Sequence, residues 1–553
     1  MASAPDGQGS CWDDVVDLLV SEGIDQVVGL PGDDLEAVSA FADSPITPRW
    51  VRDQRVAVGM AAGAALSTGR AAVCVVGRGP GAAAAVPWTM EAHSAGAPVL
   101  VISGGVPAGS EGRAAFQDAP LVELFAPVTK RAVRVTHADS TVPELVRSLA
   151  VATDAAPGPV FVELADGLGR GRRRRSTVMS VAPGPGEHAA AGLIRDAVRP
   201  VLLVGGGCAS SEGRLAQSLA ERWDVPVFCS ASGRGAVDER HPCFLGLGGL
   251  YARGQARAVI AEADLVIALG SRLEETVTMG WPEGLAVVQV TTEPAHLATH
   301  RPGVGVVASA RRSLEAWLDD PSIVPAGGPA GAAGRRRRIV EARAEGERWA
   351  AEVSDSSRGP DGGVGIPGLL RALAARLPEN SVVVHENGLA DIWTYHFPVF
   401  TLPCGALDLC PSEQTTLGFG AVAALGASRA HPDRFVVSVV GDGALAGVVR
   451  DTRAFADPDA RVLWIVLDNG GYGWLQFAGE PRWPGLFASD DDRMSCPPNA
   501  GGVEVRMAGA EEPVDQVVAE AVDHVRSRGS LILAVPVSLE DRPPAATDPP
   551  AGP

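Results

Sequence analysis

The sequence predicts an α/β protein of three consecutive domains, each built on a doubly wound parallel sheet. Three observations lead to this prediction. The chain has 553 residues, enough for three or four domains of about 150 residues each. Each third of the chain repeats one pattern, in which a short apolar run is followed by a glycine-containing turn and a helical stretch. The apolar runs are continuous rather than alternating, which is typical of strands covered by helices on both faces.

The expected strands fall into three groups, one in each third of the chain. They are 26–30, 72–76, 98–103 and 159–164, then 200–204, 226–229, 263–269 and 286–290, and finally 381–385, 434–440, 461–467 and 531–535. Two arginine runs, 172–175 and 335–338, lie in Gly/Pro/Ala-rich stretches without apolar periodicity, and we interpret both as solvated linkers. The predicted organisation is a first domain at 10–168, a linker at 169–188, a middle domain at 189–322, a linker at 323–360, a third domain at 361–538 and a disordered Pro-rich tail at 539–553.

Composition and charge exclude several classes of protein. The chain has 47 basic and 66 acidic residues and a formal charge of −19, so it has no basic surface for nucleic acid, and an anionic membrane would repel it. No apolar run reaches the ~18 residues that would span a bilayer, and the polar N-terminus is unlike a secretory signal. The eight cysteines form no CxxC pair and no zinc spacing, which favours buried thiols in a reducing cytosol. We therefore expect a cytoplasmic protein without nucleic-acid or membrane partners.

Two strand ends in the third block form a candidate metal site. One expected strand runs into Gly441, Asp442 and Gly443, and the next runs into Asn469 and Gly471. Asp442 and Asn469 are 27 residues apart, a spacing that suits a βαβ unit, in which the right-handed crossover brings both strand ends to one edge of the sheet. A carboxylate, an amide oxygen and the Gly471 carbonyl suit Mg²⁺, which usually completes its shell with phosphates. The flanking glycines let backbone N–H groups approach such phosphates closely.

This pattern resembles the thiamine diphosphate motif of the acetohydroxyacid (acetolactate) synthase and glyoxylate carboligase family. In that family the aspartate, the asparagine and a main-chain oxygen hold Mg²⁺ on the cofactor diphosphate. Other segments are similar to the family's pattern along most of the chain: VGLPGD at 28–33, GPGA at 79–82, AFQD at 115–118, PVTK at 127–130, HENG at 385–388 and TTLGFG at 415–420. The resemblance implies a pyrimidine-binding first domain, a middle domain and a diphosphate-binding third domain.

The resemblance also implies roles for individual residues. Thr415 would hold the aminopyrimidine through its main-chain carbonyl, Leu417 would prop the cofactor in a bent shape, and Gln117 would contact the bound substrate. The other implied cofactor-binding positions are Asn387, Gly388, Gly441, Asp442, Gly443, Asn469, Gly471 and Tyr472, of which Asp442, Asn469 and Gly471 would hold the metal.

One departure from the family concerns the residue that works on the cofactor. The family reads RHEQAAxFMADG, and its glutamate hydrogen-bonds N1′ of the aminopyrimidine, which promotes loss of the thiazolium C2 proton. Alignment on Met60-Ala61-x-Gly63 places Gln54 there. Glutamine can bond N1′ but has no exchangeable acid proton, and positioned proton transfer contributes about 10²–10⁴-fold to a rate. The neighbouring Asp53 is offset by about 100° on a helix. Glyoxylate carboligase is similar in lacking this glutamate and still catalyses carboligation.

Two substitutions and one segment also depart from the family's pattern. Asp33 stands near the expected reacting carbon, where it could act as an acid or base or simply cap a helix. Arg78 precedes GPG where the family has serine or threonine, and it could pair with a substrate carboxylate or lie in a solvated turn. The stretch 477–507 contains no recognisable closing helix.

The middle block contains an incomplete nucleotide-binding signature. Gly205, Gly206 and Gly207 follow an expected strand, but Ser210 occupies the last glycine position of GxGxxG. Because some middle domains of the family carry FAD and many carry nothing, FAD is the less favoured expectation for this chain.

We therefore predict an acetolactate-synthase-like carboligase or decarboxylase that depends on thiamine diphosphate and Mg²⁺, acts on a small 2-oxo acid and uses a carbonyl acceptor. The resemblance implies a homodimer or homotetramer with the cofactor at the subunit interface. The glutamine at position 54 keeps a second interpretation open, a catalytically silent homologue that binds the cofactor and serves as a structural or regulatory subunit. A third interpretation is an FAD-linked oxidase of the same family.

Overall fold

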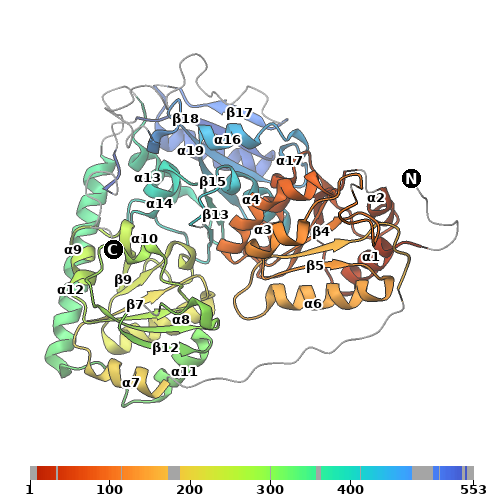
Figure 1. The fold of residues 1–553 in the computed structure, drawn as a ribbon. Helices are drawn as coiled ribbons and strands as arrows, with labels where there is room; N and C mark the ends of the chain where they lie inside the picture. The colour runs from red at the N-terminus through yellow and green to blue at the C-terminus, as the bar shows by residue number, and fades with distance from the viewer. Residues whose placement is uncertain are drawn as a thin grey trace.

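The chain folds into three parallel β-sheets flanked by helices (Figure 1). The computed structural model describes residues 9–171, 187–298, 301–355, 363–475, 502–538 and 542–544, apart from 26, 33–34, 114, 412 and 510. Within these residues each sheet has six strands, and every strand pairing is parallel. The predicted α/β class with three parallel-sheet domains is confirmed.

The first sheet has the strand order β2-β1-β3-β4-β6-β5. Its strands are β1 (Val27–Leu30), β2 (Arg49–Trp50), β3 (Ala72–Val76), β4 (Val99–Gly104), β5 (Arg131–Val135) and β6 (Val160–Leu164). The helices of this domain are α1 (Cys11–Ser21), α2 (Leu35–Ala42), α3 (Gln54–Thr68), α4 (Pro80–Ala95), α5 (Leu121–Phe125) and α6 (Thr141–Thr153).

The third sheet repeats this topology, with the order β14-β13-β15-β16-β18-β17. Its strands are β13 (Val382–His385), β14 (Leu407–Leu409), β15 (Val436–Gly441), β16 (Val462–Asp468), β17 (Glu504–Met507) and β18 (Leu531–Pro536). Its helices are α13 (Ile366–Arg376), α14 (Leu389–Tyr395), α15 (Phe419–Ala430), α16 (Asp442–Val448), α17 (Thr452–Phe455) and α19 (Val514–Ser527).

The middle sheet has a different order, β12-β11-β10-β7-β8-β9. Its strands are β7 (Pro200–Val204), β8 (Val227–Cys229), β9 (Phe244–Leu247), β10 (Leu265–Leu269), β11 (Ala286–Thr291) and β12 (Gly303–Val307). Its helices are α7 (Glu187–Asp196), α8 (Ser210–Trp223), α9 (Gly254–Ala261), α10 (Glu275–Thr278) and α11 (Ala310–Asp319).

The second arginine run is not a linker, which corrects the prediction for 323–360. It belongs to α12 (Gly328–Ser354), a 27-residue helix that lies along the middle domain (Figure 1). Arg335 is buried and donates hydrogen bonds to the carbonyls of Trp223 (3.0 Å) and Val198 (3.0 Å). An arginine can bury its stem and satisfy carbonyls with its planar head, so Arg335 packs on the middle domain beside the buried apolar residues Ile339 and Ala342 of the same helix. The first run, 172–175, lies outside the described residues.

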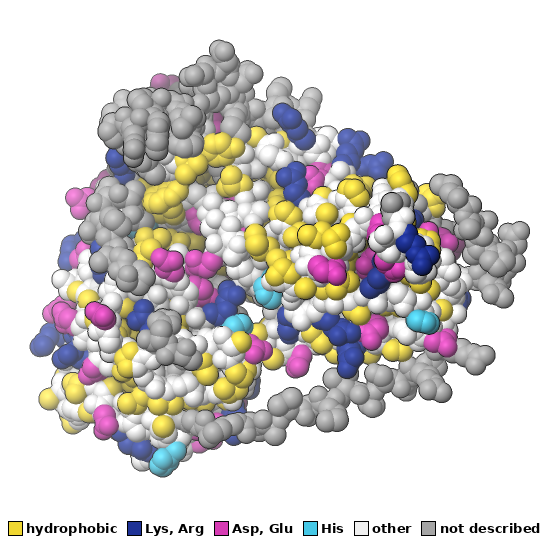
Figure 2. Space-filling view, in the orientation of Figure 1, with side chains coloured by type: hydrophobic (Ala, Val, Ile, Leu, Met, Phe, Trp, Pro, Cys, Tyr) yellow, Lys and Arg dark blue, Asp and Glu magenta, His cyan; other side chains and the backbone are white. Residues whose placement is uncertain are grey.

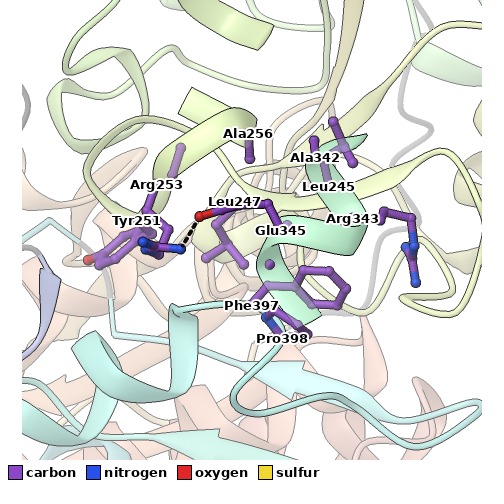
Figure 3. Close-up of a pocket in the computed structure, with 13 residues that line it drawn as sticks. Leu245, Leu247, Tyr251, Arg253, Ala256, Ala342, Arg343, Glu345, Phe397 and Pro398 are labelled. Atoms are coloured by element: carbon purple, nitrogen blue, oxygen red, sulfur yellow. Dashed lines mark hydrogen bonds and ion pairs between the residues drawn. The ribbon is translucent and has the colours of Figure 1, made fainter. Parts of the chain in front are cut away.

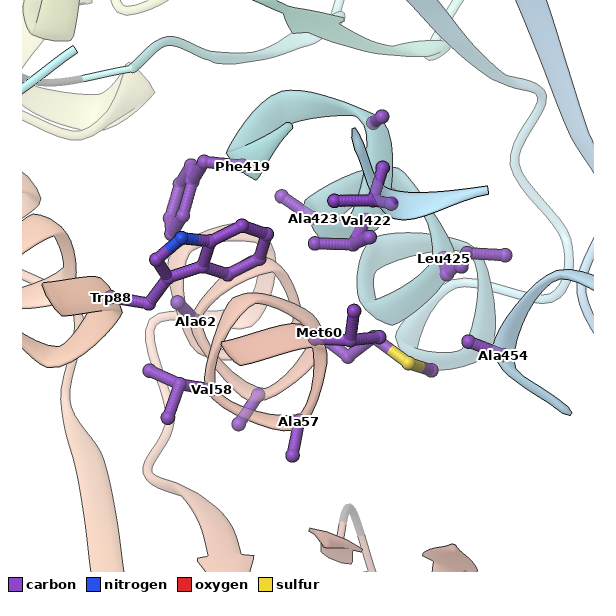
Figure 4. Packing of buried hydrophobic residues seen from close by; sticks show 14 of the residues in the cluster. Ala57, Val58, Met60, Ala62, Trp88, Phe419, Val422, Ala423, Leu425 and Ala454 are labelled. Carbon is purple, nitrogen blue, oxygen red and sulfur yellow. The ribbon is translucent and has the colours of Figure 1, made fainter. Parts of the chain in front are cut away.

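Helices α3 and α15 pack against each other and join the first domain to the third (Figure 4). Glycines bring them close, because a Cβ at Gly63 would lie 2.0 Å from the carbonyl oxygen of Ala423, and one at Gly426 would lie 1.8 Å from that of Met60. Both obstacles are backbone atoms, so neither position has room for a side chain. One apolar core therefore continues from the first sheet into the third.

A buried ion pair connects the middle domain to the third. Arg234 Nε lies 2.6 Å from Glu239 Oε1, and the Arg234 guanidinium also donates to the carbonyls of Thr394 (2.6 Å) and Phe400 (2.8 Å). Glu239 in turn accepts the N–H of Leu402 at 2.8 Å. Because both charges are hydrogen-bonded across the boundary, they fix the position of the middle domain against the loop after α14.

The described helices include none that is both long and apolar enough to cross a bilayer.

Candidate active site

Asp442 and Asn469 meet at the carboxyl edge of the third sheet. Strands β15 and β16 are parallel neighbours with Gly441 opposite Leu467, so the two residues leave adjacent strands at the same edge, as the sequence predicts. The N–H of Gly471 donates to Asp442 Oδ2 (3.1 Å) and to Asn469 Oδ1 (3.2 Å). The carboxylate and the amide oxygen therefore converge on one point.

The environment of Asp442 fits a cation. The residue is only 3% exposed, and its Oδ1 atom is buried without a hydrogen-bond partner in the described part of the chain. Burial, together with the nearby charge of Asp468, raises the pKa of Asp442 to about 7. A buried carboxylate oxygen without a partner is costly, and a bound Mg²⁺ would satisfy it with the kind of ligand that the ion prefers.

Three glycines leave space beside these oxygens. A Cβ on Gly388, Gly441 or Gly470 would meet no atom within 4 Å. Gly388 follows Asn387 in the turn between β13 and α14 and has a φ of +115°, which favours glycine. Gly443 is different, because its Cβ would lie 2.8 Å from the Tyr472 ring. The first three positions lie at or just after the carboxyl ends of β13, β15 and β16, and we call these open positions the glycine cradle.

The turn before α15 presents an unpaired acceptor and an unpaired donor. The carbonyl of Thr415 and the N–H of Leu417 have no hydrogen-bond partner within the described residues, and the Leu417 side chain is 44% exposed. Thr415 has a φ of +49°. The neighbouring carboxylate of Glu386 is buried and accepts the N–H of Gly418 at 3.0 Å. Burial and the charge of Glu91 raise the pKa of Glu386 to about 7, against the effect of its backbone hydrogen bonds.

Gln54 and Gln117 lie together at the start of α4. Gln54 opens α3, and its Nε2 atom would be 3.4 Å from a Cβ on Gly81. Gln117 has a φ of +62° and packs on Gly79, where a Cβ would lie 2.5 Å from the Gln117 carbonyl oxygen. The side-chain Oε1 of Gln117 is buried without a partner among the described residues. Asp33 lies outside the described residues.

Asp53 caps the N-terminus of α3. Its carboxylate accepts the backbone N–H of Arg55 (2.8 Å) and pairs with the Arg55 guanidinium (2.6 Å). Burial alone would raise the pKa of Asp53, but the Arg55 bonds hold it below its usual value. The Asp53 carboxylate is therefore engaged by Arg55 at the start of α3. Arg78 forms an ion pair with Asp166 at 3.3 Å, so it does not stand in a freely solvated turn.

The two groups of candidate residues are separated within one chain. Gln54 lies beside Gly81 at the start of α4, whereas the N–H of Thr416 donates to Glu91 Oε2 (2.9 Å) near the end of the same helix. Ten residues of helix at 1.5 Å each place these points about 15 Å apart. We call the Gln54–Gln117 group the glutamine half-site, and the group of Asp442, Asn469, Thr415 and Leu417 the metal half-site.

The glycine-rich turn of the middle domain is occupied by the chain itself. The N–H groups of Gly205 and Gly207 donate to the carbonyls of Leu269 (2.8 Å) and Gly270 (2.9 Å). A Cβ on Gly205 would lie 2.5 Å from the Gly270 carbonyl oxygen. These glycines therefore serve the close packing of two turns, and their N–H groups are not free to bind a phosphate.

A small cavity lies between the middle domain, α12 and the loop after α14 (Figure 3). The ion pair of Arg253 with Glu345 (2.8 Å) and the side chains of Phe397 and Pro398 line it. Its volume of about 20 Å³ is enough for one ordered water. The cavity is therefore too small for a substrate.

Sequence reasoning did not find Glu91 and Glu386. Both are buried carboxylates that hold backbone N–H groups of the turn before α15. Glu386 is adjacent to the predicted Asn387 and could have been suspected from that position. Glu91 lies in an apolar helix more than 300 residues away in sequence, and its role depends on a domain contact that no sequence pattern reveals.

Three family models match the chain in the order of its domains. The N-terminal TPP binding domain of thiamine pyrophosphate enzymes matches residues 11–124, the central domain matches 188–317, and the C-terminal TPP binding domain matches 386–532. Together these matches cover most of the chain, and the chain belongs to the thiamine pyrophosphate (thiamine diphosphate) enzyme family.

Curated relatives narrow this class to acetolactate-synthase-like proteins. The acetolactate synthase isozyme 2 large subunit of Escherichia coli (strain K12) is 27% identical over 548 residues, which is 96% of this chain and 95% of the relative. The isozyme 1 large subunit of the same strain is 27% identical over 480 residues, 83% of this chain and 81% of the relative. A probable acetolactate synthase 2, chloroplastic, of Oryza sativa subsp. japonica is 29% identical over 499 residues, 85% of this chain and 73% of the relative.

Proposed function

We propose that the protein uses thiamine diphosphate and Mg²⁺ to form or cleave a carbon–carbon bond of a small 2-oxo acid, with carboligation of the acetolactate-synthase type as the favoured reaction. The observation that carries this proposal is the metal half-site, where the unpartnered oxygen of Asp442 and the amide oxygen of Asn469 converge beside an open glycine cradle. When bound, thiamine diphosphate supplies a nucleophilic carbon for keto groups and an electron sink for loss of CO₂.

Residues of the metal half-site would hold and orient the cofactor. Asp442, Asn469 and a main-chain oxygen at Gly471 would bind Mg²⁺, and Gly388 and Gly441 would leave room for the diphosphate. The free carbonyl of Thr415 and the free N–H of Leu417 suit a heterocycle that has an amino group beside a ring nitrogen, which is the chemistry of an aminopyrimidine. The exposed Leu417 side chain would pack against the bound cofactor and support its bent shape.

The glutamine half-site would act on the reacting end. Gln54 would accept or donate one hydrogen bond at the aminopyrimidine but would not exchange an acid proton. Gln117, with its buried unpartnered Oε1, would contact the substrate. Asp33, which lies outside the described residues, stays a proposed acid or base. Loss of the acid proton predicts slow activation of the cofactor, by about 10²–10⁴-fold.

A second copy of the chain would complete the site. The half-sites lie about 15 Å apart along α4, so one chain does not place Gln54 against the Thr415 turn. Helix α4 exposes an apolar face with Ala84, Pro87 and Met90, and hydrophobic side chains gather over this region in Figure 2. Covering such a patch favours association. We propose a homodimer in which each cofactor lies between the glutamine half-site of one copy and the metal half-site of the other.

Cofactor activation tests this function. Binding of thiamine diphosphate should require Mg²⁺, and exchange of its C2 proton in D₂O should be measured for the wild type and Gln54→Glu. Exchange faster than in the free cofactor supports the enzyme and justifies a screen of 2-oxo acids. No Mg²⁺-dependent binding in the wild type contradicts the proposal.

A catalytically silent homologue is the second candidate, and Gln54 is the observation that favours it. In that case the wild type binds the cofactor without accelerating C2-proton exchange, while Gln54→Glu restores it. If adding a 2-oxo acid accelerates C2-proton exchange in the wild type, the protein is an enzyme rather than a silent homologue.

A further inference from the structure

A completely buried carboxylate of the first domain reaches into the third. Glu91 on α4 has no solvent exposure (0%), and its Oε2 atom accepts the N–H of Thr416 at 2.9 Å. Its helix neighbours Trp88 and Ala92 belong to the apolar core, and the Trp88 ring packs edge-on against Phe419, the first residue of α15 (Figure 4). A buried carboxylate is costly unless hydrogen bonds compensate. The hydrogen bond from Thr416 compensates part of the cost of burying an acid at this position.

The turn that Glu91 contacts needs external support. Thr415 has a φ of +49°, in the left-handed region that β-branched residues rarely adopt. On the other side of Leu417, Glu386 accepts the N–H groups of Gly418 (3.0 Å) and Ala421 (3.2 Å). The amides on both sides of Leu417 are thus held by carboxylates, one from each domain. Charge-assisted bonds of this kind are about twice as strong as neutral ones.

We propose that Glu91 is a positioning residue that holds residues 415–418 in the conformation that receives the aminopyrimidine. This inference rests on the proposed function. Glu91 acts through the Thr416 N–H, and its bond leaves the neighbouring Thr415 carbonyl and Leu417 N–H free for a ligand. The shape of the metal half-site then depends on a contact with the first domain of the same chain, in addition to any residue that a second copy supplies.

Hydrogen exchange of the cofactor-free protein tests the contact itself. In Glu91→Leu the side chain keeps its volume among apolar neighbours but loses the acceptor, so amide exchange in a peptide covering 413–421 should accelerate by about tenfold or more, because a protecting hydrogen bond is lost. Glu91→Gln keeps an acceptor oxygen and should stay within about threefold of the wild type.

The matched control is His431→Ala. His431 Nε2 donates to the Ser67 carbonyl at 2.9 Å, a single bond between the far ends of α15 and α3. Removing it weakens the same domain contact without touching the turn, so exchange at 413–421 should not change. Acceleration in His431→Ala equal to that in Glu91→Leu would show that general loosening explains both, and would overturn the proposal.

Cofactor affinity tests the consequence. Glu91→Leu should weaken Mg²⁺-dependent binding of thiamine diphosphate by about tenfold, which is ~1.4 kcal/mol, while His431→Ala should leave it unchanged. Adding Thr415→Gly to Glu91→Leu should recover most of the affinity, because glycine adopts the left-handed conformation without strain.

The two readouts separate this inference from the function on which it rests. A wild type that binds no cofactor contradicts the proposed function, while hydrogen exchange still reports whether Glu91 holds the turn. Unchanged exchange in Glu91→Leu overturns the inference even if the cofactor binds. Accelerated exchange with unchanged affinity also overturns it, because the turn would then not govern binding.

Discussion

The first and third domains share one frame but present opposite chemistry at corresponding positions. Numbered along the chain, both sheets have the strand order 2-1-3-4-6-5, and the helices after their second strands, α3 and α15, pack on each other. After the third strand, the first domain places Arg78 before α4, whereas the third domain places Asp442 at the start of α16. Arg78 is neutralised by Asp166, but Asp442 keeps an unpartnered oxygen.

This difference shows where function is specified in a repeated fold. The frame follows from continuous apolar strands and from glycines that let helices approach, and these features occur in both domains. The chemistry follows from the few turn residues at the carboxyl edges of the sheets. The third domain has a candidate cation site there, and the first has neutral glutamines, so we propose that each domain supplies one half of a site.

We expect the largest effect from a substitution that removes the Asp442 carboxylate, the feature that distinguishes the third domain from the first. Asp442→Ala should weaken Mg²⁺-dependent binding of thiamine diphosphate by more than about 100-fold, since even outer-sphere changes at metal sites cost about 10–100-fold. Titration calorimetry with and without Mg²⁺ measures this. The control Asp459→Ala removes an exposed carboxylate of the same domain and should leave affinity unchanged. Equal affinities of the two variants for the cofactor would contradict the proposed chemical difference between the domains.

A second prediction concerns buried histidines, which among the described residues occur only in the third domain. Burial lowers the pKa of His396 to about 4. The Nδ1–H group of this side chain donates to the Ile392 carbonyl at 2.6 Å. Its Nε2 atom is buried without a hydrogen-bond partner in the described structure. Between pH 6.5 and 4 the unfolded chain binds a proton that the folded chain does not. This residue's contribution to stability should therefore be present above pH 6.5 and fall by up to about 3 kcal/mol as the pH drops towards 4.

The difference between the wild type and His396→Gln isolates this effect from other titrating groups. Urea unfolding at several pH values should show that the wild type loses more stability than His396→Gln on acidification. Parallel pH profiles for the two proteins would contradict the assigned direction of the His396 pKa.

The smallest predicted effect tests the close approach of α3 and α15. Gly426→Ala places a Cβ against the Met60 carbonyl and should lower the free energy of unfolding by about 1–3 kcal/mol through overpacking. Gly447→Ala is the matched control, because Gly447 lies in α16 with open space around it. That substitution should instead stabilise by about 0.5–1 kcal/mol. Similar unfolding midpoints for both variants would mean that the helices are farther apart than described.

The sequence predicts the buried strands and the meeting of Asp442 with Asn469, because both depend on short-range patterns. Continuous apolar runs identify β3, β7, β15 and β16, and the βαβ spacing correctly predicts that Asp442 and Asn469 meet. The edge strands β5, β12 and β17 were not predicted, since their partly exposed residues carry no continuous apolar run.

Contacts between distant segments were beyond the sequence patterns. The arginine-rich segment 335–338 reads as a linker because its partners have no sequence signature. They are backbone carbonyls for Arg335 and the distant carboxylates of Asp224 and Glu262 for Arg336 and Arg338. Glu91 was missed for a related reason, because its hydrogen bond with Thr416 depends on the packing of α4 against the turn before α15.

The central claim is that two copies each contribute one half of every site, and subunit mixing tests it most directly. One chain carries Gln54→Glu together with Asp442→Ala, and the other is wild type. Alone, the first should not bind the cofactor, and the second should bind it with slow C2-proton exchange. In the mixed dimer, one site combines the new glutamate of the first chain with the metal half-site of the second, so we predict fast exchange on mixing. Fast exchange in the Gln54→Glu single variant but not in the mixture would show that both halves come from one chain, and would contradict the account.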